Sequence, residues 1–157
     1  RKTVFPFWAQ YHQGAGGSFI NTLVGSGPGS SKDAKGGLSV HSLATERFPG
    51  YGIGLTGLAG LLWDVGILGT CAVLGLFIAA YRVARNLLQK TPTGTLRWAN
   101  LKGAEAGVAM VGLSFLHNNM FLYEIGFQTL SMLIFGYIFY VQRTQAVVGA
   151  DRKYVNG

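Results

Sequence analysis

The sequence predicts an all-α membrane protein in which about three transmembrane helices follow a long, glycine-rich outer loop. The run from residue 51 to residue 81 contains a single charge, Asp64, and a helical span requires about 20 predominantly apolar residues. Only 12% of the 157 residues are charged, whereas soluble domains carry about 25%. Arg82, Arg85 and Lys90 follow the apolar run directly, as basic residues do at the cytoplasmic end of a span.

The composition divides the chain into an outer loop region, residues 1–50, a transmembrane region, residues 51–142, and a polar tail, residues 143–157. The first region is rich in Gly, Ser and Pro, which favour turns. Within it we expect short helices at Phe5–Tyr11 and Ser18–Leu23. The three spans are expected at about residues 54–87, 102–121 and 123–142.

The first expected span is too long for one straight crossing of a bilayer. We therefore expect a shallow helix at Leu55–Trp63, followed by the crossing proper at Val65–Tyr81. Asp64 lies between the two parts, where its carboxylate is expected to cap the inner helix.

The distribution of Lys and Arg predicts the orientation. Eight basic residues belong to the tail and to the connection after the first span, and five to the N-terminal region. This excess indicates a cytoplasmic connection and tail, with a periplasmic N-terminal loop. The bases lie beside apolar runs, which suits anionic lipid headgroups better than nucleic acid. A single cysteine, Cys71, excludes a disulfide within the chain and a zinc cluster.

Two segments of the outer loop contain residues with the chemistry of a site. The stretch GSGPGSSK, Gly25–Lys32, lacks the Gly-Lys-Ser/Thr ending of a phosphate loop. A flexible loop is the simpler interpretation, although consecutive amides in a glycine-rich turn also bind anions. His41, Glu46 and Arg47 lie in a second segment, where a proton acceptor and a diphosphate-pairing guanidinium would activate an acceptor. A solvated loop is the alternative there.

The order LVGSGPGSS, polar stretch, LTGLAGLLWDVGILG resembles the late outer loop and following helix of the O-antigen ligase and polymerase-like superfamily. Members show a Gly-x-Gly-x-Gly turn and an acid-x-Gly-x-x-Gly helix. Here the resemblance covers about residues 20–142. The corresponding structural residues are Gly25, Gly27, Gly29, Asp64, Gly66 and Gly69.

The resemblance implies a multi-pass glycosyltransferase of the bacterial inner membrane. Such proteins transfer a glycan from an undecaprenyl-diphosphate carrier to an acceptor on the periplasmic side, without a metal or other cofactor. Basic residues of the outer loop hold the diphosphate, and a His activates the acceptor hydroxyl. By this resemblance His41 is the candidate base, and Arg47, Lys32 and Lys35 are the candidate diphosphate contacts.

One departure from the family pattern keeps a second hypothesis open. Many members place a His-Asn pair at the head of the acid-Gly helix, where this chain has Leu55 and Thr56. The second hypothesis is that the chain is a non-enzymatic accessory subunit, whose helices pack against other transmembrane helices of a larger photosynthetic or respiratory complex. A transporter fragment is a third hypothesis. Because the sequence begins Arg-Lys-Thr, without an initiator Met or a signal peptide, we expect either a processed protein or, in preference, a piece of a longer polytopic protein. An independent subunit is the alternative.

Overall fold

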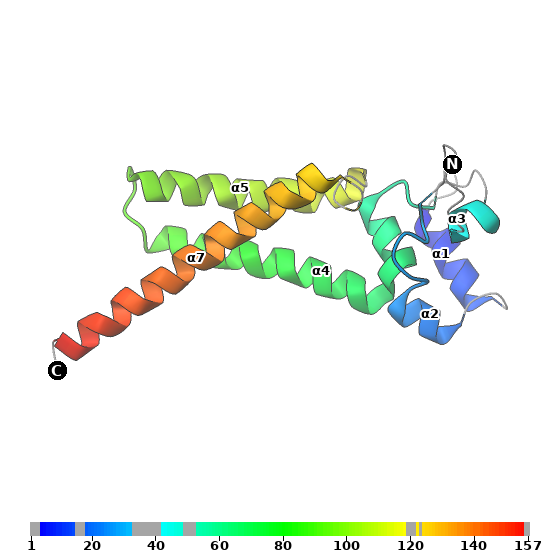
Figure 1. The fold of residues 1–157 in the computed structure, drawn as a ribbon, viewed down its shortest axis with the longest axis horizontal. Coiled ribbons are helices and arrows are strands. Elements are labelled where there is room, and N and C mark those ends of the chain that lie inside the picture. Colours follow the sequence, from blue (N-terminus) through cyan, green and yellow to red (C-terminus); the bar gives the residue numbers. More distant parts are fainter. Residues whose placement is uncertain are drawn as a thin grey trace. The chain divides into compact units, whose positions relative to one another are not determined.

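The computed structural model describes residues 4–14, 18–32, 42–48, 53–118, 122 and 124–155, with side chains as far as residue 145. Within these ranges the regular structure is helical and contains no strand. The helices, drawn in Figure 1, are α1 (Val4–Gln13), α2 (Phe19–Val24), α3 (Leu43–Glu46), α4 (Gly57–Gln89), α5 (Leu96–His117) and α7 (Ile125–Val155).

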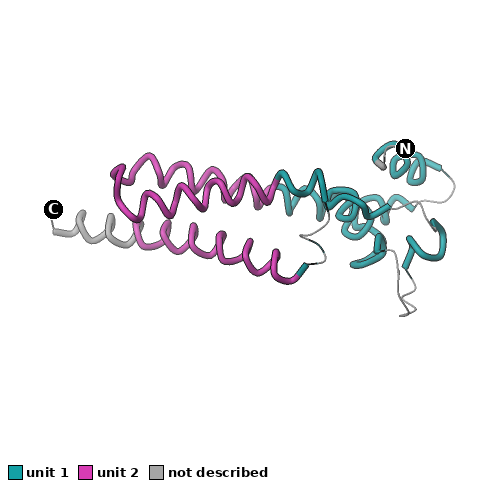
Figure 2. The backbone as a smooth tube through the Cα atoms, turned by 90° about the horizontal axis from the view of Figure 1, so that it is seen from above, with its two compact units in different colours: residues 1–74, 113–124 teal, residues 75–112, 125–157 magenta. Residues whose placement is uncertain are grey.

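The chain divides into two compact units, which Figure 2 distinguishes by colour. Unit 1 consists of residues 1–74 and 113–124, and unit 2 of residues 75–112 and 125–157. Helices α4 and α5 therefore each contribute one part to unit 1 and another to unit 2.

Among the described residues, two helices have the length and apolar composition that a membrane span requires, namely α4 and residues Ile125–Gln145 of α7. Only 33% and 22% of their most apolar windows are buried inside the protein, whereas the core helix of a soluble protein is mostly buried. Their outward faces carry Leu68, Leu76, Leu133 and other large apolar side chains. A bilayer would cover this surface, so the two helices indicate a membrane protein.

The expected second span, residues 102–121, falls largely within α5. This helix is not among those that meet the criteria of length and apolar composition, and it carries Arg97, Lys102 and Glu105 in its first half. A third crossing stays a prediction. Lys102 and Glu105 form the ion pair expected from their i, i+3 spacing.

The helical boundaries follow the sequence closely in some places and depart from it in others. Helices α1 and α2 lie where short helices were expected. Helix α4 is interrupted at Gly66 (φ 67°, ψ −168°), next to the expected break between a shallow helix and a crossing. From residue 67 to residue 89 it rises about 34 Å, enough for a hydrocarbon core of about 30 Å. Helix α7 continues through Val155, beyond the span end expected at residue 142.

Unit 2 is built from helix segments of α4, α5 and α7 that lie side by side (Figure 2). The rings of Phe77 and Phe135 meet edge to face with centroids 5.0 Å apart, and Ile134 packs against the bare backbone of Gly107. Most of the buried side chains are small or apolar, and the polar ones are Thr91, Glu105 and Ser131. The apolar ones include Ala80, Ala84, Leu87, Leu101, Ala104, Val108, Val111, Ile138 and Val141. The packing is therefore that of small residues and apolar knobs, as in membrane helix bundles.

Candidate functional site at the glycine-rich loop

The break in α4 provides backbone acceptors for the glycine-rich loop of unit 1. Carbonyl groups in the last turn before the end of a helix lack the usual amide donors four residues ahead. Here the amide of Ser26 donates to the Trp63 carbonyl (2.8 Å), and the amide of Gly27 donates to the Asp64 carbonyl (3.0 Å). The loop after α2 is thus attached to the helix break at Gly66.

The side chain of Asp64 completes this attachment. One carboxylate oxygen, Oδ1, accepts from the Ser30 hydroxyl (2.9 Å) and from the Ser31 amide (2.8 Å), and Oδ2 accepts from the Gly29 amide (3.0 Å). Asp64 is 7% exposed. The glycine-rich turn therefore does surround an anion, but the anion is a carboxylate of the protein itself. We expected Asp64 to cap the helix that follows; its carboxylate binds the preceding loop instead.

Two glycines of this junction are required by the close approach of two backbones. A Cβ atom on Gly25 would overlap the backbone of Asp64, and one on Gly66 would overlap the backbone of Leu23. Both residues also have a positive φ, 84° and 67°, a conformation that side chains with a Cβ rarely adopt. The end of α2 therefore lies directly on the break in α4.

The other glycines of the pattern are used differently. Gly27 and Gly29 have φ values of 103° and 83°, so they supply turn conformations, and a Cβ on either would meet open space. Gly69 is helical, and a Cβ there would press on the side chain of Val65.

Short helix α3 joins the candidate diphosphate contacts to this loop. The amide of Ala44 donates to the Ser30 carbonyl (3.0 Å), and the hydroxyl of Ser42 donates to the Lys32 carbonyl (2.7 Å). Ser42 is also the N-cap of α3, where its hydroxyl accepts from the Thr45 amide. The segment before Arg47 and the segment that ends at Lys32 are therefore neighbours.

Arg47 lies just after α3, and its side chain bonds to one residue of α1. Its Nη1 donates to the hydroxyl of Tyr11 in α1 (2.8 Å), while the side chains of Arg47 and Lys32 are both exposed. A guanidinium has five N–H donors, so this one bond leaves it able to bind an anion. The other two candidates, His41 and Lys35, lie outside the described residues.

An aromatic cluster of unit 1 includes Tyr11, the hydrogen-bond partner of Arg47. Its centre is Trp63, which is 1% exposed, with ring centroids of Tyr11, His12 and Phe48 at 5.3, 5.4 and 5.6 Å. A ring nitrogen of His12, Nδ1, lies 2.9 Å from the Trp8 carbonyl. Among the described residues no partner meets the buried indole nitrogen of Trp63.

Tyr11 and His12 were not among the residues singled out from the sequence. Tyr11 is 36 residues away from the arginine that it contacts, and no local pattern predicts such a pair. One signal was present: Trp8, Tyr11 and His12 have i, i+3 and i+4 spacing, which places them on one face of a short helix.

The glycine-rich loop, α3 and the aromatic cluster form one polar and aromatic surface region that presents two exposed bases. Comparison with known proteins gives no further assignment, since no family model, curated protein or solved structure matches this chain.

Proposed function

We propose that the chain is part of a membrane glycosyltransferase of the polysaccharide ligase and polymerase-like type, acting on an undecaprenyl-diphosphate-linked glycan. The observation that carries the proposal is the junction between the two halves of the motif. The Gly-x-Gly-x-Gly turn and the Asp64-x-Gly66 break contact each other through the Asp64 carboxylate and two backbone bonds. A junction of this kind fixes a polar loop at the head of an apolar helix, where a lipid-linked substrate is delivered.

The reaction requires three events at this surface. An acceptor hydroxyl attacks the anomeric carbon of the carried sugar, and a base, His41 in this proposal, takes the proton of that hydroxyl. The bond between the anomeric carbon and the diphosphate oxygen breaks, and the diphosphate leaves with its negative charge. Arg47, Lys32 and Lys35 are the proposed contacts of that charge, because guanidinium and ammonium groups form strong charge-assisted hydrogen bonds with phosphate oxygens.

The support for Arg47 is its position. It is exposed, and the Tyr11 hydroxyl fixes one arm of its guanidinium, which reduces the side-chain entropy that diphosphate binding would cost. His12, in the same cluster as Tyr11, is a second histidine to compare with His41 in any test of the base.

The proposed location is the bacterial inner membrane, with residues 1–50 in the periplasm and the connection between α4 and α5 in the cytoplasm. The excess of basic residues around that connection supports this orientation.

The test is glycan transfer by the protein in its native membranes. Arg47→Ala and His41→Ala are expected to abolish transfer while leaving expression unchanged. Tyr11→Phe should reduce transfer less, because the Arg47 guanidinium remains and loses only its hydrogen bond to the Tyr11 hydroxyl. Arg82→Ala, which removes an exposed charge from unit 2, is the matched control and should transfer normally. Normal transfer by both Arg47→Ala and His41→Ala would remove these residues from the mechanism.

A second function, a non-enzymatic subunit of a larger membrane complex, is favoured by one observation. Leu55, 65% exposed at the head of α4, and Thr56 occupy the place of the family's His-Asn pair. The discriminating observations are the length of the parent reading frame and co-purification. About ten further hydrophobic segments upstream would favour the transferase, and stoichiometric association with a large complex would favour the subunit.

A further inference from the structure

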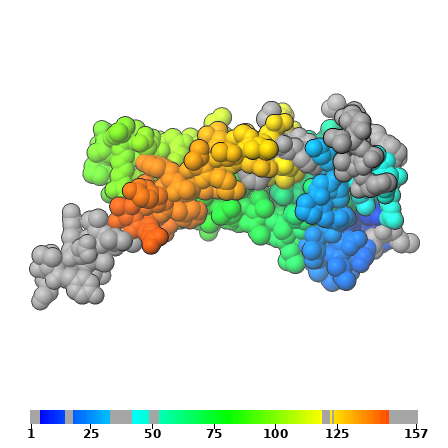
Figure 3. Space-filling view, in the orientation of Figure 1, coloured from blue at the N-terminus to red at the C-terminus, as the bar shows by residue number. Residues whose placement is uncertain are grey.

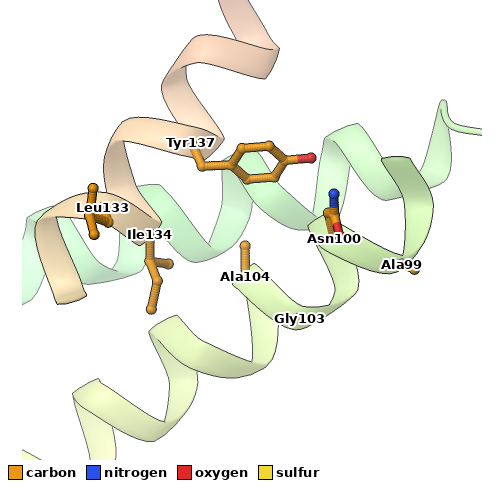
Figure 4. A pocket seen from close by; sticks show the side chains of 7 residues that line it. All are labelled: Ala99, Asn100, Gly103, Ala104, Leu133, Ile134 and Tyr137. Atoms are coloured by element: carbon orange, nitrogen blue, oxygen red, sulfur yellow. The ribbon is translucent and has the colours of Figure 1, made fainter. Parts of the chain in front are cut away.

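Unit 2 contains a groove between α5 and α7 that the proposed transfer reaction does not use. It has a volume of about 410 Å³ and is lined by Ala99, Asn100, Gly103 and Ala104 of α5 and by Ile134 and Tyr137 of α7. Ile134 of α7 contacts Gly107 of α5, and Figure 3 shows α7, in orange, crossing in front of the green helices of the unit. In the close-up of Figure 4 the Tyr137 ring extends across the groove toward Asn100. Gly103 and Ala104 also line the groove, and neither has a large side chain to fill it.

Arg97 lies one helical turn before the groove residue Asn100, on the same face of α5, and bonds to α7. Its Nη2 donates to the Val141 carbonyl of α7, one turn beyond Tyr137, over a long 3.4 Å. Arg97 is exposed. A guanidinium has five donors, so a long bond to a carbonyl leaves it able to bind an anion beside the polar end of the groove.

Unit 2 as a whole carries a strongly positive net charge. Unit 2 contains two acidic residues, Glu105 and Asp151, and Glu105 is already paired with Lys102. The basic residues of unit 2 are Arg82, Arg85, Lys90, Arg97, Lys102, Arg143, Arg152 and Lys153. An occupant with an apolar body and an anionic end is complementary to this arrangement.

The size of the groove favours a lipid chain over a transmembrane helix. A helix with its side chains is about 10 Å across and rises 5.4 Å per turn, so a single turn occupies about 400 Å³. The groove would therefore hold no more than one turn of a partner helix, whereas an acyl chain is a single file of methylene groups. We propose that the groove binds one acyl chain of an anionic phospholipid, with the phosphate at Arg97 and the glycerol ester groups near Asn100 and Tyr137. This inference rests on the membrane location and is independent of glycan transfer.

The test uses the protein purified in a neutral detergent, with thermal stability measured against added lipid. Phosphatidylglycerol is expected to raise the midpoint of unfolding more than phosphatidylcholine with the same acyl chains, and glycerol phosphate, a headgroup without chains, is expected to raise it little. Equal stabilisation by the two phospholipids, or by glycerol phosphate alone, would overturn the proposal.

Two pairs of variants locate the effect. Arg97→Gln should weaken the apparent affinity for phosphatidylglycerol about fivefold and leave that for phosphatidylcholine unchanged, whereas Arg82→Gln, the matched loss of an exposed charge, should bind normally. Gly103→Leu should abolish the response, because a side chain at Gly103 enters open space in the groove. Gly136→Leu, also into open space on α7 but outside the groove, should respond as the wild type does. Wild-type responses from Arg97→Gln and Gly103→Leu would contradict the assignment.

A photo-crosslinking group at position 103 gives a readout that does not depend on stability. In native membranes it should attach to phospholipid, and the same group at position 136 should show no preference for anionic lipid. Attachment to another protein at position 103 would show that a partner helix occupies the groove instead.

Discussion

The loop junction of unit 1 and the helix bundle of unit 2 use opposite means to hold segments together. In unit 1 a buried carboxylate, two carbonyl groups at a helix break and two bare glycine backbones fix the loop to α4. In unit 2 the contacts are between apolar or small residues, such as Phe77 with Phe135 and Ile134 with Gly107. Polar contacts of defined direction tolerate little change, whereas apolar contacts in a membrane compete with lipid chains of similar polarity. Substitutions at the junction of unit 1 should therefore lower stability more than substitutions in the helix bundle of unit 2.

The largest effect is expected from Gly66→Val. The side chain would overlap the backbone of Leu23 and would have to adopt a φ of 67°, at a combined cost of about 4 kcal/mol. Limited proteolysis of residues 18–32 should become much faster. The control is Gly75→Val in the same helix, where a Cβ meets open space. If the two variants resisted protease equally, the close approach of α2 to the helix break would be refuted.

The next effect is expected from Asp64→Ala. It leaves the Gly29 and Ser31 amides and the Ser30 hydroxyl without their acceptor, which should cost about 3 kcal/mol. Asp64→Asn should cost less, about 2 kcal/mol, because one oxygen still accepts while the amide nitrogen opposes the Gly29 amide. Amide hydrogen exchange of residues 25–32 measures both. Unchanged protection in Asp64→Ala would show that the carboxylate does not hold the loop.

In unit 2, Phe135→Ala removes one ring of an edge-to-face pair and leaves a space that lipid or neighbouring side chains fill. We expect a loss of about 1–2 kcal/mol, measured as the midpoint of unfolding in detergent. A loss equal to that of Asp64→Ala would abolish the distinction between the two units.

The smallest effect is expected from Lys102→Gln. The lysine is 57% exposed in its pair with Glu105, and exposed ion pairs contribute about 0.2–1 kcal/mol before screening by salt. The same unfolding measurement, made at low and high salt, should show a difference below about 0.5 kcal/mol. A larger, salt-independent loss would mean that Glu105, which is 7% exposed, depends on this partner for its burial.

The sequence predicted local features better than distant ones. The apolar runs predicted the two long helices, and Asp64 within the first run marked the place where that helix breaks. The connection between the first two expected spans, which end at residue 87 and begin at residue 102, is shorter in the structure. Helix α5 begins at Leu96 after Thr95, whose hydroxyl accepts from the Trp98 amide. That N-cap was recognisable from the residue type.

The long-range contacts were not predictable in the same way. The partners of Asp64 lie more than thirty residues earlier in the chain, and Arg47 and Tyr11 are similarly distant. Nothing in residue type or periodicity specifies which distant donor meets which acceptor, because that pairing depends on how the loop folds over the helix. The spacing of the glycines in the sequence indicated a turn, but it did not show which glycines are required. The structure shows that a Cβ atom on Gly25 would overlap the backbone of Asp64.

The most direct test of the membrane assignment uses Cys71, which lies on α4 after the break and is exposed on the protein surface. In intact membranes a charged, impermeant maleimide should leave Cys71 unlabelled, although the thiol should react once the membrane is dissolved and the protein unfolded in SDS. Thr93→Cys in a Cys71→Ser background, at an exposed position between α4 and α5, should be labelled from one side of the membrane only. Protection of Cys71 by lipid is the predicted result, and rapid labelling of Cys71 in intact membranes would contradict the account.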